Sequence, residues 1–267
     1  MRFDYLNVPI FIVCRDKLSP LVQLVEWLER HGYQRLLLVD NASTYPPLLD
    51  YFERTPHRVV RHDQNLGPYD SIWSSGIRDR YAPESYFVVT DCDVLPDSGC
   101  PGDAVAFFHW ALSRFPSFVK AGFGLRIDDL PECNELAESV RRWERHFWTL
   151  RFALNLYMAP IDTTFALYRP RSSFNFEPAI RTGKPYVARH QPWYVDTQHR
   201  TGEDLYYREH ADPRIGHWER HGDTKPGKSD KRSLKAKVQW RAHAMLRMEQ
   251  DRTVPRRYRP GLRRALG

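Results

Sequence analysis

Short apolar runs alternate with amphipathic stretches through the first hundred residues of the chain. Val8–Cys14 is apolar and β-branched, which is typical of a strand buried on both faces. Ser19-Pro20 follows, and apolar residues then recur at helical spacing as far as Gly32, so this segment predicts a helix. The same alternation predicts strands at Leu36–Val39, Arg58–Val60 and Tyr86–Thr90, with helices at Pro47–Arg54 and Tyr69–Tyr81 between them. Strands that alternate with helices in this way indicate a parallel, doubly wound α/β sheet.

An acidic residue follows each of these predicted strands. The carboxyl ends of parallel strands meet at one edge of a sheet, and this edge is where open α/β sheets bind ligands. Clustered carboxylates repel one another unless a cation or a donor-rich ligand offsets their charge. The acids at the four strand exits are Asp16, Asp40, Asp63 and the pair Asp91 and Asp93.

The segment Asp91-Cys92-Asp93 is suited to metal binding. In extended backbone, residues i and i+2 point to the same face, so both carboxylates can converge on one ion. The chain has neither a GxGxxG after the first strand nor a GxxxxGK[ST] segment, which are the usual phosphate cradles. A divalent ion held by carboxylates is another way to neutralise a diphosphate. The alternative is a solvated turn with no ligand.

Several of these segments together resemble the nucleotide-sugar-dependent glycosyltransferases of the GT-A fold, family 2 type. Val8–Asp16 followed by Leu36–Thr44 is similar to the opening of those enzymes. Asn65-Leu66-Gly67-Pro68 is similar to the loop that closes over their nucleotide, and Asp91-Cys92-Asp93 to their DxD metal motif. The resemblance covers about residues 5–100 and is much thinner beyond Asp97.

The resemblance implies a role for individual residues. It implies that Asp40 hydrogen-bonds the nucleobase or ribose and that Asn65 and Gly67 line the nucleotide pocket; we add Arg15, at the first strand exit, to this set. It also implies that Asp93, assisted by Asp91, holds a Mn²⁺ or Mg²⁺ ion that bridges the diphosphate of the donor.

The second half of the chain is expected to form an irregular acceptor half. Phe118–Ile127 and Pro160–Arg169 predict strands, and Cys133–Leu150 predicts a helix that is rich in aromatic and basic residues. These aromatic side chains either pack in the core or line a groove for an acceptor sugar.

The resembling family uses an acidic residue to deprotonate the acceptor hydroxyl, and two candidates for this base stay open. One is Asp162, at the start of a predicted strand. The other is the pair Glu203 and Asp204, which lies late in the chain for that role. Either candidate could instead be a surface acid or a charge at a helix N-terminus. The choice between an inverting and a retaining reaction stays open with it.

His190 is a candidate third metal ligand. It lies in His190-Gln191-Pro192-Trp193, directly after the predicted strand Pro185–Ala188. Several GT-A enzymes place a histidine after a late strand in this way, and an imidazole suits Mn²⁺ better than Mg²⁺. A structural histidine is the alternative.

The net charge of +7 is concentrated at one end of the 267-residue chain. Residues 218–267 contain 15 Lys and Arg against 5 Asp and Glu, so the preceding 217 residues carry a net charge of −3. This distribution does not favour a nucleic-acid partner for the body of the protein. We expect a single catalytic domain at 1–217, with the donor half at 1–100 and the acceptor half at 101–217. The basic, helical extension at 218–267 is either solvated or bound to an anionic membrane surface.

The remaining features of the composition concern location. The four cysteines form no CxxC pair, which favours reduced thiols, and the N-terminus has no apolar signal core. We therefore expect a cytoplasmic protein, with possible peripheral contact to the inner membrane face.

Together, these patterns predict a metal-dependent glycosyltransferase. It would move a sugar from a nucleoside diphosphate sugar to a glycan or lipid-linked acceptor. The alternatives are a sugar-phosphate nucleotidylyltransferase, which normally has a glycine-rich loop after the first strand, and a non-catalytic nucleotide- or glycan-binding protein of the same fold.

Overall fold

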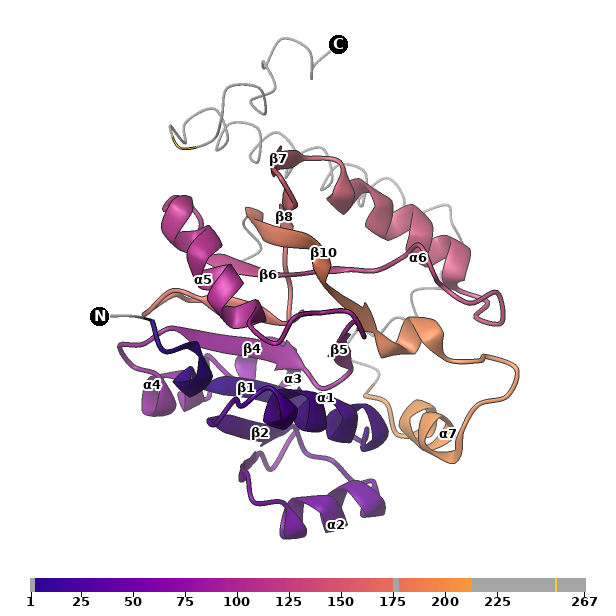
Figure 1. Cartoon of the computed structure of the whole chain (residues 1–267). Helices are drawn as coiled ribbons and strands as arrows, with labels where there is room; N and C mark the ends of the chain where they lie inside the picture. Colours follow the sequence, from indigo (N-terminus) through magenta and orange to yellow (C-terminus); the bar gives the residue numbers. More distant parts are fainter. Residues whose placement is uncertain (1–2, 175–177, 213–252, 254–267) are drawn as a thin grey trace.

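The computed structural model describes residues 3–174, 178–212 and 253, and it places one ten-stranded sheet at the centre of the chain (Figure 1). The strands are β1 (Ile10–Cys14), β2 (Leu36–Asp40), β3 (Arg58–Arg61), β4 (Phe87–Asp91), β5 (Val94–Pro96), β6 (Lys120–Leu125), β7 (Arg151–Ala153), β8 (Leu156–Pro160), β9 (Ala166–Tyr168) and β10 (Pro178–His190). The helices are α1 (Ser19–Arg30), α2 (Pro46–Arg54), α3 (Gly67–Asp70), α4 (Ile77–Tyr81), α5 (Ala104–Arg114), α6 (Ala137–Glu144) and α7 (Gly202–Glu209). Short 3-10 helices lie at Tyr5–Asn7, Arg145–Trp148 and Gln191–Tyr194.

The order of the strands confirms the predicted α/β fold. The path through the sheet is β3-β2-β1-β4-β9-β6-β10-β8-β7, and β5 pairs with β10 beside that path. The four strands of the N-terminal half, β3, β2, β1 and β4, run parallel to one another. Val13 lies opposite Val39 on one side and Asp91 on the other, so the strands β1, β2 and β4 end at the same level.

Beyond β4 the sheet is mixed. β9 pairs antiparallel with both β4 and β6, β10 pairs parallel with β6, and β10 pairs antiparallel with β8 and β5. This half gathers the end of β10 and the loop before β9 at the edge where β1 and β4 end.

Helices cover both faces of the sheet, as a doubly wound arrangement requires. On one face, side chains of α1 and α5 such as Leu24 and Phe108 pack with Ile10 and Ile12 of β1. On the other face, Phe11 and Val13 of the same strand pack with the segment that contains α3 and α4. Because successive side chains of β1 point to opposite faces, an uninterrupted apolar run supplies both cores.

Three predicted elements differ in the structure. The single helix predicted at 69–81 is divided into α3 and α4 by a turn at residues 71–76, where Gly76, the N-cap of α4, adopts a left-handed conformation with φ of +77° that is incompatible with a continuous helix. The helix predicted at 133–150 is shorter, with α6 followed by a 3-10 turn. The strand predicted at 160–169 is confined to β9, and β8 precedes it.

The predicted basic extension at 218–267 lies outside the described residues, apart from Thr253. In the part of the chain that the structure describes, no helix combines the length and the apolar character needed to cross a bilayer.

Candidate active site

A cavity of about 690 Å³ opens at the edge where β1 and β4 end. It extends from the loop after β1 to α6 and to the end of β10. Seven of the residues predicted to form the site line it: Arg15, Asn65, Gly67, Asp91, Asp93, Asp162 and His190. Asp40, Glu203 and Asp204 do not line it.

Asp93 follows β4 and is held beside two basic side chains. Its Oδ2 lies 3.0 Å from Lys17 Nζ, and its Oδ1 lies 3.6 Å from His190 Nε2. Burial alone would raise the pKa of the Asp93 carboxyl, but Lys17 and His190 outweigh that effect and hold the pKa below its ordinary value. Asp93 therefore presents a charged carboxylate to the cavity.

Asp91 has the opposite electrostatic setting. Burial and the neighbouring charge of Asp93 raise the pKa of its carboxyl well above the ordinary value. The Thr163 hydroxyl donates a hydrogen bond to Asp91 Oδ2, and the Asp91 N–H donates to the Thr163 carbonyl at 2.9 Å. The pKa values of two acids separated by one residue are thus shifted in opposite directions, because Lys17 and His190 lie beside Asp93.

His190 ends β10, opposite Val94 of β5, and this pairing brings it to Asp93. Burial lowers the pKa of its imidazole, which favours the neutral form that binds metals. Its Nδ1 and the Oδ1 of Asp93 are both buried without a hydrogen-bond partner in the structure.

These donors fit a divalent cation in chemical type. The unsatisfied Asp93 Oδ1 and the His190 Nε2 that lies 3.6 Å from it are an oxygen and a nitrogen of the types that Mn²⁺ accepts. No group of three His, Cys, Asp or Glu side chains in the described ranges is already arranged around a common point. The remaining ligands of such an ion would therefore come from a diphosphate and water, as is usual for ions that bridge phosphates.

The Asn65–Gly67 loop is held against the exit of β2 by Asn41. Asn41 Nδ2 donates to Asn65 Oδ1 at 2.7 Å and to the Gly67 carbonyl at 3.2 Å, and Asn41 Oδ1 accepts from the Leu66 N–H at 2.8 Å. Gly67 adopts φ of +78°, a conformation that favours glycine. The loop that was predicted to close over a nucleotide is therefore fixed at the rim of the cavity.

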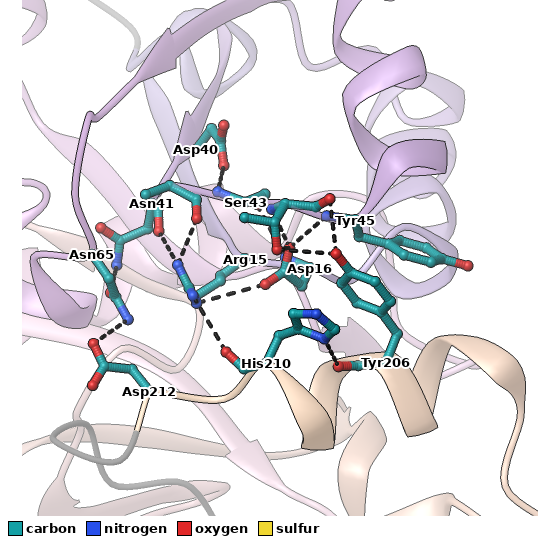
Figure 2. Close-up of polar contacts among 12 residues, drawn as sticks. Arg15, Asp16, Asp40, Asn41, Ser43, Tyr45, Asn65, Tyr206, His210 and Asp212 are labelled. Atoms are coloured by element: carbon teal, nitrogen blue, oxygen red, sulfur yellow. Dashed lines mark hydrogen bonds and ion pairs between the residues drawn. The ribbon is translucent and has the colours of Figure 1, made fainter.

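Figure 2 shows how the exits of β1 and β2 are tied to the segment after α7. Arg15 Nη1 donates to the carbonyls of Asn41 at 3.0 Å and Ala42 at 2.6 Å, and its Nη2 lies 3.4 Å from the His210 carbonyl (Figure 2). Asn65 Nδ2 lies 3.4 Å from Asp212 Oδ2. Arg15 therefore lines the cavity while its guanidinium supports the loop after β2.

Asp40 is buried in the turn after β2. Its Oδ1 accepts the Ser43 N–H at 2.9 Å (Figure 2), and its Oδ2 accepts from Arg61 Nε at 3.2 Å. Through these contacts Asp40 stabilises the turn, and its carboxylate does not line the cavity.

Glu203 and Asp204 belong to the first turn of α7. Asp204 forms a capping box with Thr201, in which its carboxylate accepts the Thr201 N–H at 3.1 Å and its own N–H donates to the Thr201 hydroxyl. Glu203 accepts hydrogen bonds from the N–H and hydroxyl of Ser19 at the start of α1. Both acids line a neighbouring cavity of about 220 Å³ instead.

Asp162 is exposed and lies in the loop that leads to β9. Its Oδ1 accepts hydrogen bonds from the Thr164 N–H at 3.1 Å and the Thr164 hydroxyl at 2.8 Å, which fixes the carboxylate in a tight turn. The strand that follows, β9, joins the sheet beside β4. Asp162 and Asp93 consequently line the same cavity.

Aromatic side chains and a buried ion pair form the other end of the cavity. Trp143 and Phe147, from α6 and the turn after it, line this end together with Glu144 and Arg181. Arg181 Nη1 lies 2.8 Å from Glu144 Oε2, and its guanidinium lies 4.5 Å above the Phe147 ring. Two of the aromatic residues predicted for this segment therefore face the cavity.

Sequence reasoning missed three residues of this site. Lys17, Asn41 and Thr163 each contact one of the predicted residues. Asn41 and Lys17 directly follow predicted strand exits, and that position was a signal that could have identified them. Thr163 had no comparable signal, because its partner Asp91 is 72 residues away.

Comparison with known proteins does not assign the chain to a family. The sequence matches no protein-family model and no curated protein. Among solved structures, the chain is similar to a glucosyl-3-phosphoglycerate synthase from Mycobacterium tuberculosis, in complex with phosphoglyceric acid. The sequence identity is 14% and the TM-score is 0.39, with 61% of this chain and 57% of that chain covered. This chain therefore spans less than two thirds of that structure, and the similarity does not define its function.

Proposed function

We propose that this protein is a metal-dependent glycosyltransferase that moves a sugar from a nucleoside diphosphate sugar to an acceptor hydroxyl. One observation carries the proposal: the cavity at the strand ends brings Asp93 and His190 together with the Asn65–Gly67 loop and Asp162. It thus combines donors for a cation, a loop at the rim and a further carboxylate within one space. The acceptor would be a glycan or a lipid-linked glycan.

The donor would bind between the β1 exit and the Asn65–Gly67 loop. Arg15, Asn65 and Gly67 line this end, where they offer a guanidinium, an amide and backbone groups to a nucleotide. Asp93 and His190 would hold a Mn²⁺ or Mg²⁺ ion, with Asp91 beside them, and the bound ion would stabilise the charge of the departing diphosphate.

Asp162 is the proposed base. It would accept the proton of the acceptor hydroxyl as the oxygen attacks the anomeric carbon and the bond to the diphosphate breaks. The turn to Thr164 keeps its carboxylate in place at the cavity wall. Asp204 and Glu203 are the second choice, because their carboxylates are bound to Thr201 and Ser19.

A donor screen tests the proposal. Purified protein is incubated with Mn²⁺ and, one at a time, UDP-, GDP-, ADP- and CDP-sugars, and release of the nucleoside diphosphate is measured. We expect release with one donor class, loss of release in EDTA, and loss in Asp93→Ala. Release of pyrophosphate from a sugar phosphate and a nucleoside triphosphate would indicate a nucleotidylyltransferase instead. Absence of both reactions and of nucleotide binding would overturn the enzymatic proposal.

A further inference from the structure

Lys17 is paired with one of the two oxygens of Asp93, the carboxylate proposed to hold the metal ion. Its Nζ lies 3.0 Å from Asp93 Oδ2 and 4.4 Å from the centre of the Tyr207 ring. The side chains of Lys17 and Asp93 are only 15% and 12% exposed. The ammonium group is thus enclosed between an acid that follows β4 and an aromatic ring from α7.

The turn after β1 is what presents Lys17 to the cavity. Asp16 adopts φ of +50°, and its Oδ1 accepts the N–H groups of Thr44 at 2.5 Å and Tyr45 at 2.8 Å. Asp16 is therefore turned into the protein, and the next residue, Lys17, lines the cavity.

We propose that Lys17 is a tethered cation that competes with the divalent metal for Asp93 and moves to the diphosphate when the donor binds. This inference rests on the proposed function, because it assigns the nucleoside diphosphate as the ligand that draws Lys17 away. A metal ion held by Asp93 Oδ1 and His190 would share one carboxylate with the ammonium group on Oδ2, and two cations that close together repel strongly in a partly buried site. A phosphate oxygen offers the ammonium group a charged partner equivalent to the carboxylate.

The consequence is coupling between the metal and the nucleotide. Metal alone must displace Lys17 from Asp93 without giving the ammonium group a new partner, so it binds weakly. A diphosphate supplies that partner and frees Asp93, so metal binds more tightly when the nucleotide is present. By thermodynamic linkage, the metal strengthens nucleotide binding by the same factor.

A purely structural Lys17 would behave differently. If its only role were to neutralise a buried carboxylate, its removal would lower the thermal stability. The affinities for Mn²⁺ and for the nucleotide would then not depend on the side chain at position 17. The binding of Mn²⁺ without any nucleotide therefore distinguishes the two roles.

The experiment titrates Mn²⁺ alone into four proteins by calorimetry: the wild type, Lys17→Met, Lys17→Arg and Lys184→Met. Lys184 is a matched control, because it pairs with Asp128 at the surface and does not line the cavity. We expect Lys17→Met to bind Mn²⁺ about tenfold or more tightly than the wild type, the equivalent of about 1.4 kcal/mol. Lys17→Arg, which keeps the charge, and Lys184→Met should bind it as the wild type does.

Two further measurements complete the test. The gain in Mn²⁺ affinity should disappear in the double variant Lys17→Met/Asp93→Ala, because both cations act on Asp93. Mn²⁺ is then titrated at a fixed concentration of ADP, CDP, GDP or UDP, and the nucleotide that binds should raise the Mn²⁺ affinity of the wild type by a larger factor than that of Lys17→Met, in which the diphosphate can still ligate the ion. If Lys17→Met does not melt cooperatively, Lys17→Gln replaces it.

If the folded wild type and Lys17→Met bind Mn²⁺ with equal affinity, the inference is overturned. It is also overturned if neither protein binds Mn²⁺ measurably. A gain that survives in the double variant would overturn it as well. If no nucleotide binds to any of the proteins, the proposed function fails, while the titration with Mn²⁺ alone still decides whether Lys17 competes for Asp93.

Discussion

Asn41 is the residue whose removal should most clearly disturb the donor end of the cavity. Its side chain is buried and makes three hydrogen bonds, to Asn65, Leu66 and Gly67, at 2.7–3.2 Å. Asn41→Ala removes all three bonds at once. It leaves the Leu66 N–H and the Gly67 carbonyl without this partner, although Asn65 Oδ1 keeps the Gly67 N–H at 3.0 Å.

The expected loss of stability follows from these contacts. Leaving a buried polar group unpaired costs about 1–3 kcal/mol, so the three bonds together should contribute about 2–4 kcal/mol to the free energy of unfolding, allowing for water at the partly exposed partners. For a chain of this size each kcal/mol shifts the melting temperature by about 2–4 °C, so Asn41→Ala should melt roughly 4–16 °C lower. The affinity for the nucleotide should fall as well, because the loop loses its fixed position.

The assay is thermal unfolding followed by circular dichroism, with nucleotide titrations below the transition. Asn7→Ala is the matched control, because Asn7 is exposed and its amide donates only to Asp4 at 2.6 Å. It should change the stability by less than about 0.5 kcal/mol. Asn41→Asp keeps an acceptor for the Leu66 N–H and should fall between the two. If Asn41→Ala and Asn7→Ala melt at the same temperature, the loop does not depend on Asn41 and this reasoning is refuted.

Four further predictions concern individual acids. Asp93→Ala should abolish the part of nucleoside diphosphate binding that depends on Mn²⁺ while the protein still melts cooperatively; calorimetry with equal affinity in Mn²⁺ and in EDTA would contradict this. Asp162→Asn should remove transfer to an acceptor and spare donor binding, since it deletes a proton acceptor and keeps the shape, and measurable transfer by the variant would exclude Asp162 as the base. Asp40→Ala should lower the melting temperature through its turn contacts, and nucleotide titration of the same variant decides whether Asp40 also binds the donor. Hydrogen bonds from Lys184 and Arg126 lower the pKa of Asp128 to about 2; a depressed pKa stabilises the fold above the ordinary value near 3.8, and this contribution is lost as the pH falls toward 2. Lys184→Met should therefore flatten the decline of stability with acid between pH 4 and pH 2, and an unchanged slope would count against the pairing.

β1, β2 and β4 could be predicted because these strands are buried, whereas β3, at the edge of the sheet, is partly exposed. β1 and β2 are continuous apolar runs, and β4 ends in a polar exit, so both their extent and their ends are visible in the sequence. β10 was predicted only from Pro185 onward. Its earlier part contains Arg181, Gly183 and Lys184, and it is a strand because it pairs with β6 and β8, which the local sequence does not reveal.

The Glu203-Asp204 pair is a sequence pattern that fits two different roles. An acidic pair at the start of a helix resembles the catalytic pair of a known enzyme family, and it also fits the pattern of an N-terminal cap. Thr201 three residues before Asp204 is the spacing of a capping box, and the structure shows that box. The cap could therefore have been predicted from the sequence, whereas the position of Asp162 beside β4 depended on the order of strands in the sheet.

The direction of each side chain at a strand exit is what the sequence alone could not provide. Acids were expected at four strand exits on one edge, and their mutual repulsion was the reason to expect a cation. In the structure, Asp16 and Asp40 turn inward and accept backbone N–H groups of the loop after β2, and Asp63 is exposed and does not line the cavity, which leaves Asp91 and Asp93 there. Because Asp16 turns inward, β1 presents Lys17 beside Asp93. The chain thus supplies one cation itself, and under the proposal above Lys17 would compete with a divalent metal for Asp93.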